Sequence, residues 1–265
     1  MTKARTLADF ISDGNPLADG TIAVSEVSGA APLASPTFTG TATVAGNLSV
    51  DGGTIKLDGN YPVGTSNVAL GDAAGAAITS GGRNTLIGGS AGDALTVGQR
   101  NVVIGTDALS ADTQGSRSVA IGQAALANQN FTSATDNYNV AVGFQAGVNI
   151  STGIKNTFIG GLSGDATTTA EENTAVGYES MTTNTTGGDN SASGAYSLRM
   201  NTTGSNNAAM GYSALEQNST GGSNTAVGYK ALEANTTADN NTAVGYQAGY
   251  TKLLAPTILL LGLML

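Results

Sequence analysis

Clustered carboxylates are the nearest approach in this chain to a familiar acid–base site. The sequence contains no His and no Cys, so imidazole and thiolate bases, nucleophiles and metal ligands are excluded. The densest acidic group is Glu171, Glu172 and Asp189. A glycosidase needs two carboxyl groups that face each other across a bond, whereas neighbouring residues of an extended segment point apart. We expect a solvated corner here, and a protein that is not an enzyme and holds no metal or cofactor.

Phosphate and nucleic-acid chemistry is also disfavoured. Glycine runs such as Gly88–Gly92 look like phosphate-binding loops, but no Lys-Ser or Lys-Thr follows them. The net charge is −9 and the pI is about 4.2. Because nucleic-acid binding requires cations that neutralise phosphates, we expect no nucleic-acid partner.

The glycines belong to a repeat related to Asn-Thr-Ala-Val-Gly, as at Asn224–Gly228. Nine of the ten intervals between repeat glycines are 17 residues, and the step from Gly122 to Gly143 is 21. A fixed period indicates stacked units that bury their apolar faces against their neighbours. The eleven repeat glycines are Gly71, Gly88, Gly105, Gly122, Gly143, Gly160, Gly177, Gly194, Gly211, Gly228 and Gly245.

Positions numbered from the repeat glycine have distinct chemistry. Position −1 is apolar in ten of eleven copies, with Ser193 the exception, and position −2 is mostly Ala. Successive residues of a strand face opposite sides, so we place position −1 in the core. We expect position −2 and the leucines at +4 to be buried against another chain. The Ala or Ser at +3 predicts a second short strand, after a turn that a β-carbon at position 0 would obstruct.

A polar column accompanies the glycines. Position −4 is Asn in ten copies and Ser118 in the other, which predicts a stacked amide ladder at a corner. Asn-Thr-Thr-Gly at 184–187 and 201–204 marks a second corner. The fold class is therefore all-β: a parallel β-roll or β-solenoid of about eleven 17-residue coils, roughly 50 Å long at ~4.8 Å per coil.

Three regions follow from the extent of the repeat. Residues 1–66 lack it, and we expect a short helix around Leu7, Phe10 and Ile11 followed by β-rich pieces with Pro and Gly. Residues 67–250 form the roll. Residues 251–265 are an apolar tail, shorter than the ~20 residues of a spanning helix. A buried cap or a shortened gene end is favoured over a membrane anchor. We expect no signal peptide at the N-terminus, because Asp9 and Asp13 fall where its hydrophobic core would lie.

The phrase Asn139–Gly143 with Ala146, and Ser118–Gly122 with Ala125, resemble the head repeats of trimeric autotransporter adhesins. These YadA-like repeats form a left-handed parallel β-roll. The resemblance covers residues 67–250 and implies that handedness and a homotrimer. The period of 17 is longer than is typical of that family, so the corner loops must differ.

Two further phrases, Ala31–Gly40 and Asn241–Gly249, are similar to tail fibres of bacteriophages. This likeness implies a virion protein that attaches to a phage tail or baseplate through residues 1–66 and presents the roll to a host cell-surface glycan or protein. The alternative is a fragment of a bacterial surface adhesin of the autotransporter kind. Ice binding by Thr-rich faces is less favoured, because the Asn-Thr-Thr copies are irregular and the early coils lack them.

Two groups of aromatic residues are candidates for receptor contacts. Tyr212, Tyr229 and Tyr246 occupy position +1 in three consecutive coils; such a row could bind sugar rings or form a structural ladder. The four extra residues between Gly122 and Gly143 predict a loop near 128–138, and loops carry recognition. Phe131 and Tyr138 are its candidates, with a neutral loop as the alternative.

Overall fold

A computed structural model describes residues 64–250 and the strand 259–261. The described residues all belong to the unit Lys56–Leu265. The expected N-terminal helix and β-rich pieces, and most of the apolar tail, lie outside the described residues.

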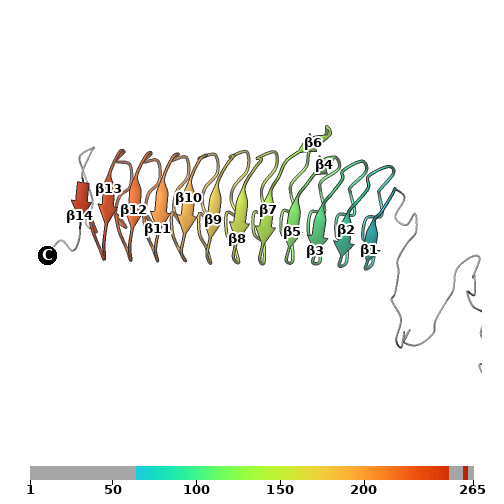
Figure 1. The fold of residues 1–265 in the computed structure, drawn as a ribbon, viewed down its shortest axis with the longest axis horizontal. Coiled ribbons are helices and arrows are strands. Elements are labelled where there is room, and N and C mark those ends of the chain that lie inside the picture. The colour runs from blue at the N-terminus through green and yellow to red at the C-terminus, as the bar shows by residue number, and fades with distance from the viewer. Residues whose placement is uncertain (1–63, 251–258, 262–265) are drawn as a thin grey trace, which may run out of the picture. The chain divides into compact units, whose positions relative to one another are not determined.

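The described chain is built from short strands joined by turns and bends, with no helix in residues 64–250 (Figure 1). The strands are β1 (Val68–Leu70), β2 (Thr85–Ile87), β3 (Val102–Ile104), β4 (Gly115–Ser116), β5 (Val119–Ile121), β6 (Thr135–Asp136), β7 (Val140–Val142), β8 (Thr157–Ile159), β9 (Thr174–Val176), β10 (Ser191–Ser193), β11 (Ala208–Met210), β12 (Thr225–Val227), β13 (Thr242–Val244) and β14 (Leu259–Leu261).

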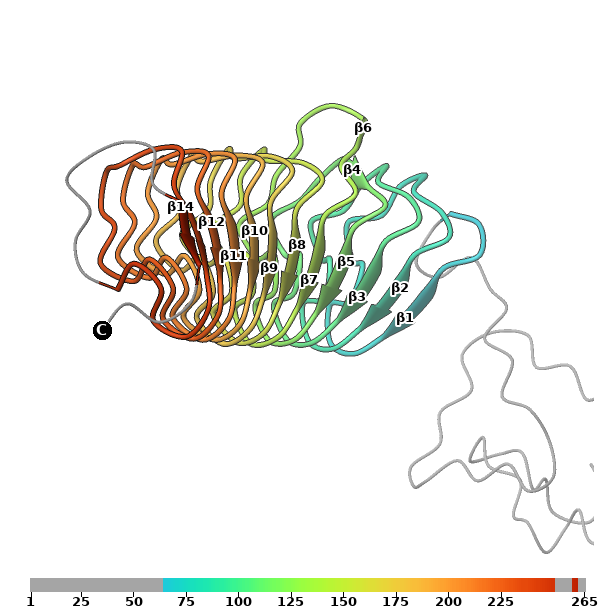
Figure 2. The same ribbon diagram turned by 60° about the vertical axis from the view of Figure 1, so that its left-hand side comes forward.

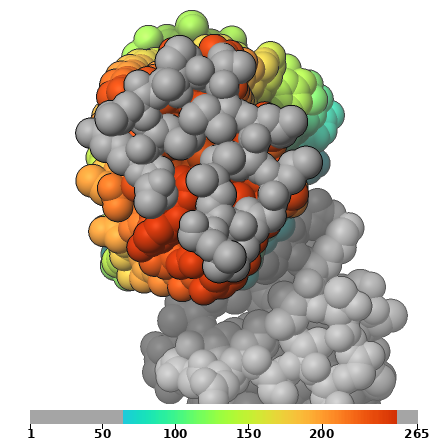
Figure 3. Space-filling model, turned by 90° about the vertical axis from the view of Figure 1, so that its left-hand side faces the viewer, coloured from blue at the N-terminus to red at the C-terminus, as the bar shows by residue number. Residues whose placement is uncertain are grey.

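Twelve of these strands form one parallel sheet, in which each strand pairs with the strand one coil further along the chain. The register places equivalent repeat positions side by side, as in Val68↔Thr85 and Leu70↔Ile87. The coils therefore stack one behind another (Figures 2 and 3). This confirms the predicted parallel β-solenoid.

The sheet extends one strand beyond the eleven copies. In β14, Leu259 pairs with Thr242 and Leu261 with Val244, which keeps the 17-residue register. In the sequence, Gly262 also follows Gly245 by 17 residues. This copy departs from the repeat pattern, because Ile258 replaces the asparagine and three leucines replace the usual strand residues.

The core lies at position −2, so the sequence-based assignment of position −1 to the core is wrong. Position −1 faces outward, and Leu70, Ile159 and Met210 are 45%, 40% and 58% exposed. The narrow coil explains the difference, because its interior also holds large side chains at +4 or +7, such as Leu215 and Ile150, and leaves room mostly for alanine at −2. The buried residues at −2 are Leu86, Val103, Ala120, Ala141, Phe158, Ala175, Ala192, Ala209, Ala226 and Ala243.

The large side chains at +4 complete this core within the same chain, rather than against another chain as expected from the sequence. Leu215 and Leu232 are fully buried where position −2 is Ala. Where position −2 is Phe158, position +4 is Gly164, and a β-carbon there would lie 2.6 Å from the Phe158 ring. At Phe158 the two positions are thus complementary in size; where both are small, as at Ala141 and Gly147, the buried Ile150 at +7 fills the interior.

The segment after the repeat glycine is a turn and not the predicted second strand. Positions +2 and +4 both have positive φ, as at Ser213 (53°) and Leu215 (52°). This left-handed conformation disfavours side chains that carry a β-carbon. Burial of the leucines and the hydrogen bonds between coils hold it, for example from Leu215 N–H to the Ala231 carbonyl (3.0 Å).

The repeat glycine is required by the turn, as predicted. Gly160 has φ +135°, and a β-carbon built on it would lie 2.3 Å from the carbonyl oxygen of Gly177 in the next coil. Neither the backbone conformation nor the space admits another residue. The repeat therefore keeps glycine at position 0 in every copy.

The asparagines at −4 form the predicted amide ladder. Asn173 Oδ1 accepts the backbone N–H of Asn190 (3.0 Å), and its Nδ2 donates to the Gly187 carbonyl (2.9 Å) and to Asn156 Oδ1 (3.3 Å). These bonds satisfy buried backbone groups at the corner. The second corner carries its own ladder of Asn184, Asn201, Asn218 and Asn235, linked from Nδ2 to Oδ1 at 2.9–3.0 Å.

The four extra residues between Gly122 and Gly143 form a protrusion at one edge of the solenoid, where β4 and β6 make a separate two-stranded parallel sheet (Figures 1 and 2). Gln129 and Tyr138 keep their ordinary places in the coil, because their neighbours bond to the flanking coils at Asn130 N–H to Ser151 O (2.9 Å) and Asn137 N–H to Ser116 O (3.0 Å). The insertion is therefore confined to the segment between them, as the spacing predicts.

Candidate functional site

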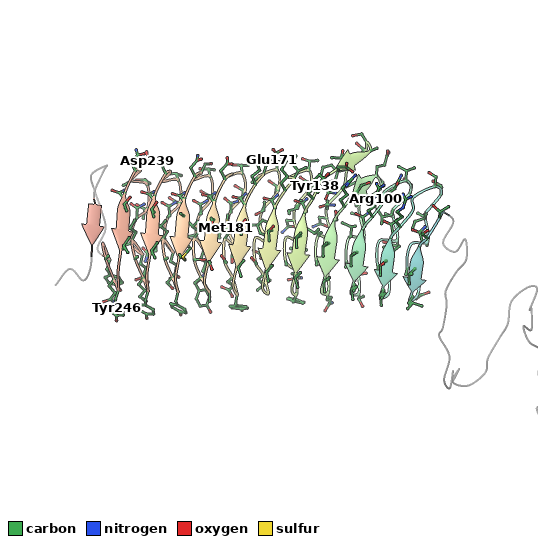
Figure 4. The ribbon with its side chains drawn as sticks, viewed as in Figure 1. Arg100, Tyr138, Glu171, Met181, Asp239 and Tyr246 are labelled. Atoms are coloured by element: carbon green, nitrogen blue, oxygen red, sulfur yellow. The ribbon has the colours of Figure 1, made fainter. Side chains whose placement is uncertain are left out.

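The solenoid presents two different edges, one at each end of the strands. Figure 4 shows Tyr246 on one edge and Arg100, Tyr138, Glu171 and Asp239 on the opposite one. We call the first the glycine edge (positions 0 and +1) and the second the corner edge (positions −6 and −5). The candidate surfaces lie on these edges and on the outer face of the sheet between them.

Large apolar side chains are concentrated on the outer sheet face and the glycine edge. The outward residues at −1 that are most exposed are Leu70, Ile104, Ile159, Val176, Met210 and Val244, between 36% and 58%. Beside them at +1, Phe144 and the tyrosines are also exposed. The strip follows position −1 along the sheet except at Ser193, and at +1 it begins with Phe144, because the first four coils carry Asp72, Gly89, Thr106 and Gln123 there. An exposed apolar strip marks an interaction site.

The tyrosines at +1 form a structural ladder between coils. The rings of Tyr212 and Tyr229 stack with centroids 5.5 Å apart, and those of Tyr229 and Tyr246 with centroids 5.2 Å apart. Tyr196, at position +2, joins Tyr178 to Tyr212 through edge-to-face contacts. Because the flat ring faces cover one another, the row offers a ligand mainly ring edges. Stacking of sugars on these faces is therefore restricted.

The insertion loop separates its two candidate residues. Phe131 is only 7% exposed, so the prediction that it contacts a receptor at the surface is wrong: an apolar side chain in an otherwise polar loop packs inward. Tyr138 is half exposed. Its ring lies under the Arg117 guanidinium, 5.4 Å from centroid to Cζ, and Arg117 Nε lies 2.9 Å from Asp136 Oδ1.

The clustered carboxylates do not form a catalytic pair. Glu172 binds Lys155, with Nζ 2.6 Å from Oε1. That hydrogen bond lowers the pKa of the Glu172 carboxyl, whereas a general acid needs a raised pKa. Glu171, Glu172 and Asp189 are all exposed, as expected for a solvated corner.

A buried carboxylate that sequence reasoning missed lies below the insertion loop. Asp112 Oδ1 accepts the N–H groups of Gly115 (2.9 Å) and Phe131 (3.1 Å), and its Oδ2 accepts from Gln129 Nε2 (2.6 Å). Burial raises the pKa of this carboxyl, against the lowering effect of the hydrogen bonds. Its place at +7, in the column of Asn184 and Asn201, is the signal that would have found it.

The corner edge carries a row of cations that the sequence analysis also missed. Position −5 is occupied by Arg83, Arg100 and Arg117 in consecutive coils, and by Lys155 two coils later. The described residues contain six cations, and the other two are Arg199 and Lys230. Alignment of the coils on their glycines reveals the row, because residues 17 apart lie side by side.

Within residues 64–250, no group of three or more acidic side chains is placed to hold a metal ion. The part of the chain that the structure describes has no helix long and apolar enough to cross a membrane. No protein-family model, no curated protein and no solved structure matches the chain.

Proposed function

We propose that this chain is a structural adhesion protein, a phage tail fibre whose solenoid presents a host-binding surface. A β-solenoid is compatible with a fibre or adhesin role. The observation that carries the proposal is the regular, eleven-copy coil with exposed apolar and cationic columns and no paired catalytic carboxylates among the described residues. Stacked coils display the same column many times, which suits extended, multivalent contacts.

The proposed assembly is a homotrimer that covers the outer sheet face and the glycine edge. Eleven coils at ~4.8 Å give a length of about 50 Å, and five residues from −3 to +1 at ~3.3 Å give a width of about 16 Å. The product is about 800 Å², the area that one partner contributes to a stable interface. The apolar side chains at −1, and the aromatic side chains at +1 from Phe144 onward, supply its chemistry.

This interface replaces the one expected from the sequence, in which positions −2 and +4 met another chain. Identical copies suit this surface because the same column recurs at a constant spacing along it. Two columns of equal period remain in register along their whole length. Charged substitution at position −1 should therefore dissociate the assembly without unfolding the coil.

Electron microscopy of phage particles labelled with an antibody to this chain tests the assignment. Label along a thin appendage of the tail is expected, and label elsewhere on the particle, or none, refutes it. The alternative, a surface adhesin fragment of the autotransporter kind, predicts label on intact bacterial cells without phage.

An exposed threonine row favours ice binding as a second candidate. Position +9 is an exposed threonine in six consecutive coils, at Thr152, Thr169, Thr186, Thr203, Thr220 and Thr237. The neighbouring hydroxyls at +8 bond to the next coil, as from Thr185 Oγ1 to the Thr202 carbonyl (3.0 Å), so only one row is free to order water. A thermal-hysteresis assay separates the candidates: activity would support ice binding, and the fibre proposal predicts none.

A further inference from the structure

We infer that the cation row of the corner edge binds an acidic polysaccharide that carries carboxylate or sulfate groups. The inference deepens the proposed adhesion function by naming the chemistry of the glycan and the residues that contact it. The residues that carry the inference are Arg83 and Arg100, two exposed arginines in adjacent coils. Neither guanidinium has an ion-pair partner among residues 64–250.

The backbone fixes the spacing of the row. Arg83 N–H donates to the Thr65 carbonyl (2.9 Å), and Arg100 N–H donates to the Gly82 carbonyl (3.0 Å). Arg117 continues the pattern through the Gln99 carbonyl (2.9 Å). All three arginines have positive φ, between 58° and 66°. The three arginine side chains therefore project from hydrogen-bonded backbone positions that are ~4.8 Å apart.

The surroundings leave the first two guanidinium groups open. Gly81 and Gly82 precede Arg83, and Gly98 lies two residues before Arg100. The backbone next to the two arginines therefore carries few side chains. The carboxylates of these coils lie elsewhere: Asp72 and Asp107 are at positions +1 and +2, on the side of the glycine edge, Asp93 is at position +5, and Asp112 is buried. A planar guanidinium forms paired hydrogen bonds with carboxylate or sulfate oxygens.

The row also has defined ends. Arg117 and Lys155 are partly neutralised by Asp136 and Glu172, and the next coils carry Glu172 and Asp189 at the same position. An anionic chain would therefore lie along the segment from Arg83 to Arg117, about 10 Å for two intervals of ~4.8 Å, because the insertion loop with Asp136 protrudes from the same edge before Lys155 (Figures 1 and 4). Since the chain as a whole is acidic, with a net charge of −9, this segment is where a polyanion can approach.

The edge faces away from the proposed subunit interface. Arg100 and Tyr138 lie on the edge opposite Tyr246 (Figure 4), so a trimer formed through the sheet face and glycine edge leaves the row accessible. Three parallel rows in one fibre would raise the avidity for a long polymer.

The test uses the full chain and three probes: heparin, which carries sulfate in addition to carboxylate groups; polygalacturonate, which carries carboxylate groups alone; and neutral dextran. Binding is measured by titration at low salt for the wild type and for the double variant Arg83→Gln/Arg100→Gln. The matched control is Arg199→Gln/Lys230→Gln, which removes two cations that are not in the row. Circular dichroism and sedimentation check that each variant keeps its fold and assembly.

We expect wild type and control to bind at least one acidic probe and not dextran. The row variant should bind about 30-fold more weakly, because each exposed cation near an anionic surface contributes roughly fivefold. A comparison of heparin with polygalacturonate identifies the favoured anion. Absence of binding by the wild type, or an equal loss in the control, overturns the inference. Salt-sensitive self-association that requires the row, without glycan binding, would assign it to a second copy instead.

The outcome is separable from that of the proposed function. If the purified chain binds the glycan through the row but no virion appendage is labelled, the inference holds and the fibre assignment fails. If an appendage is labelled but the chain binds no acidic probe, only the inference fails.

Discussion

Substitution of one repeat glycine by alanine tests the turn on which the stacking of coils depends. We choose Gly160→Ala, in the middle of the solenoid. Its φ of +135° belongs to a region in which non-glycine residues cost ~1–3 kcal/mol. The added β-carbon would also meet the Gly177 carbonyl oxygen at 2.3 Å, and such overpacking costs a further ~1–3 kcal/mol.

The two effects together predict that the free energy of unfolding falls by about 4 kcal/mol. Guanidinium denaturation followed by circular dichroism measures it. Because coils can open locally, hydrogen exchange of the Gly177 amide is the sharper probe. That amide donates to the Ile159 carbonyl at 2.7 Å, and its exchange should accelerate by about a thousandfold for 4 kcal/mol.

The neighbouring Gly161→Ala is a matched control. Gly161 lacks positive φ, and its added β-carbon would meet only the Tyr178 ring, at 3.6 Å, an ordinary contact. We expect a change in the free energy of unfolding within about 0.5 kcal/mol. Equal destabilisation by the two substitutions would refute the reasoning that the carbonyl of the next coil excludes a side chain at position 0.

Three further substitutions test the core, the ladder and the buried carboxylate. Leu215→Ala should lower the free energy of unfolding by about 2–5 kcal/mol because Leu215 is fully buried, whereas a loss below about 1 kcal/mol would contradict its place in the core. Asn173→Ala should cost about 2–5 kcal/mol in chemical denaturation, since it leaves the Asn190 N–H and the Gly187 carbonyl without a partner; a cost equal to that of the exposed Thr174→Ala would contradict this. For Asp112, burial raises the folded-state pKa above the ordinary 3.8, so the folded chain binds its proton more tightly than the unfolded chain. The stability of the wild type relative to Asp112→Asn should therefore rise as pH falls through the raised pKa and level off near 3.8; a flat or opposite trend in pH-dependent denaturation would contradict the assignment.

The period, the parallel stacking, the turn glycine and the asparagine ladder could all be predicted from the sequence. Each depends on an interval or a local conformation, and Gly160 and Asn173 show both in the structure as expected. The position of the insertion was predictable for the same reason, since the interval between Gly122 and Gly143 is the one that changes.

The inward and outward faces could not be assigned from the apolar character of single positions. Alternation places −1 and −3 on one face and −2 on the other, but it does not decide which face is the interior. The decisive factor is size: the interior also holds the large side chain of Met181 at +4, and the small Ala175 is the strand residue that is buried beside it. The complementarity of Phe158 with Gly164 was visible in the sequence and would have pointed to position −2.

The candidate site was less predictable because it depends on neighbours one coil away. The place of Phe131 in a loop predicts exposure, but its apolar ring packs inward. Arg83 and Arg100 do not stand out as a pair in the sequence, since 17 residues separate them. Their juxtaposition follows only from the register of the coils.

Sedimentation equilibrium of the purified chain tests the proposed assembly most directly. We predict a mass of three times the chain mass of 26.1 kDa, and a shift to the single-chain mass for Ile104→Glu/Met210→Glu with the circular dichroism spectrum unchanged. A wild-type chain that sediments at 26.1 kDa at every concentration, with its apolar columns at −1 and +1 left open to water, would contradict the account.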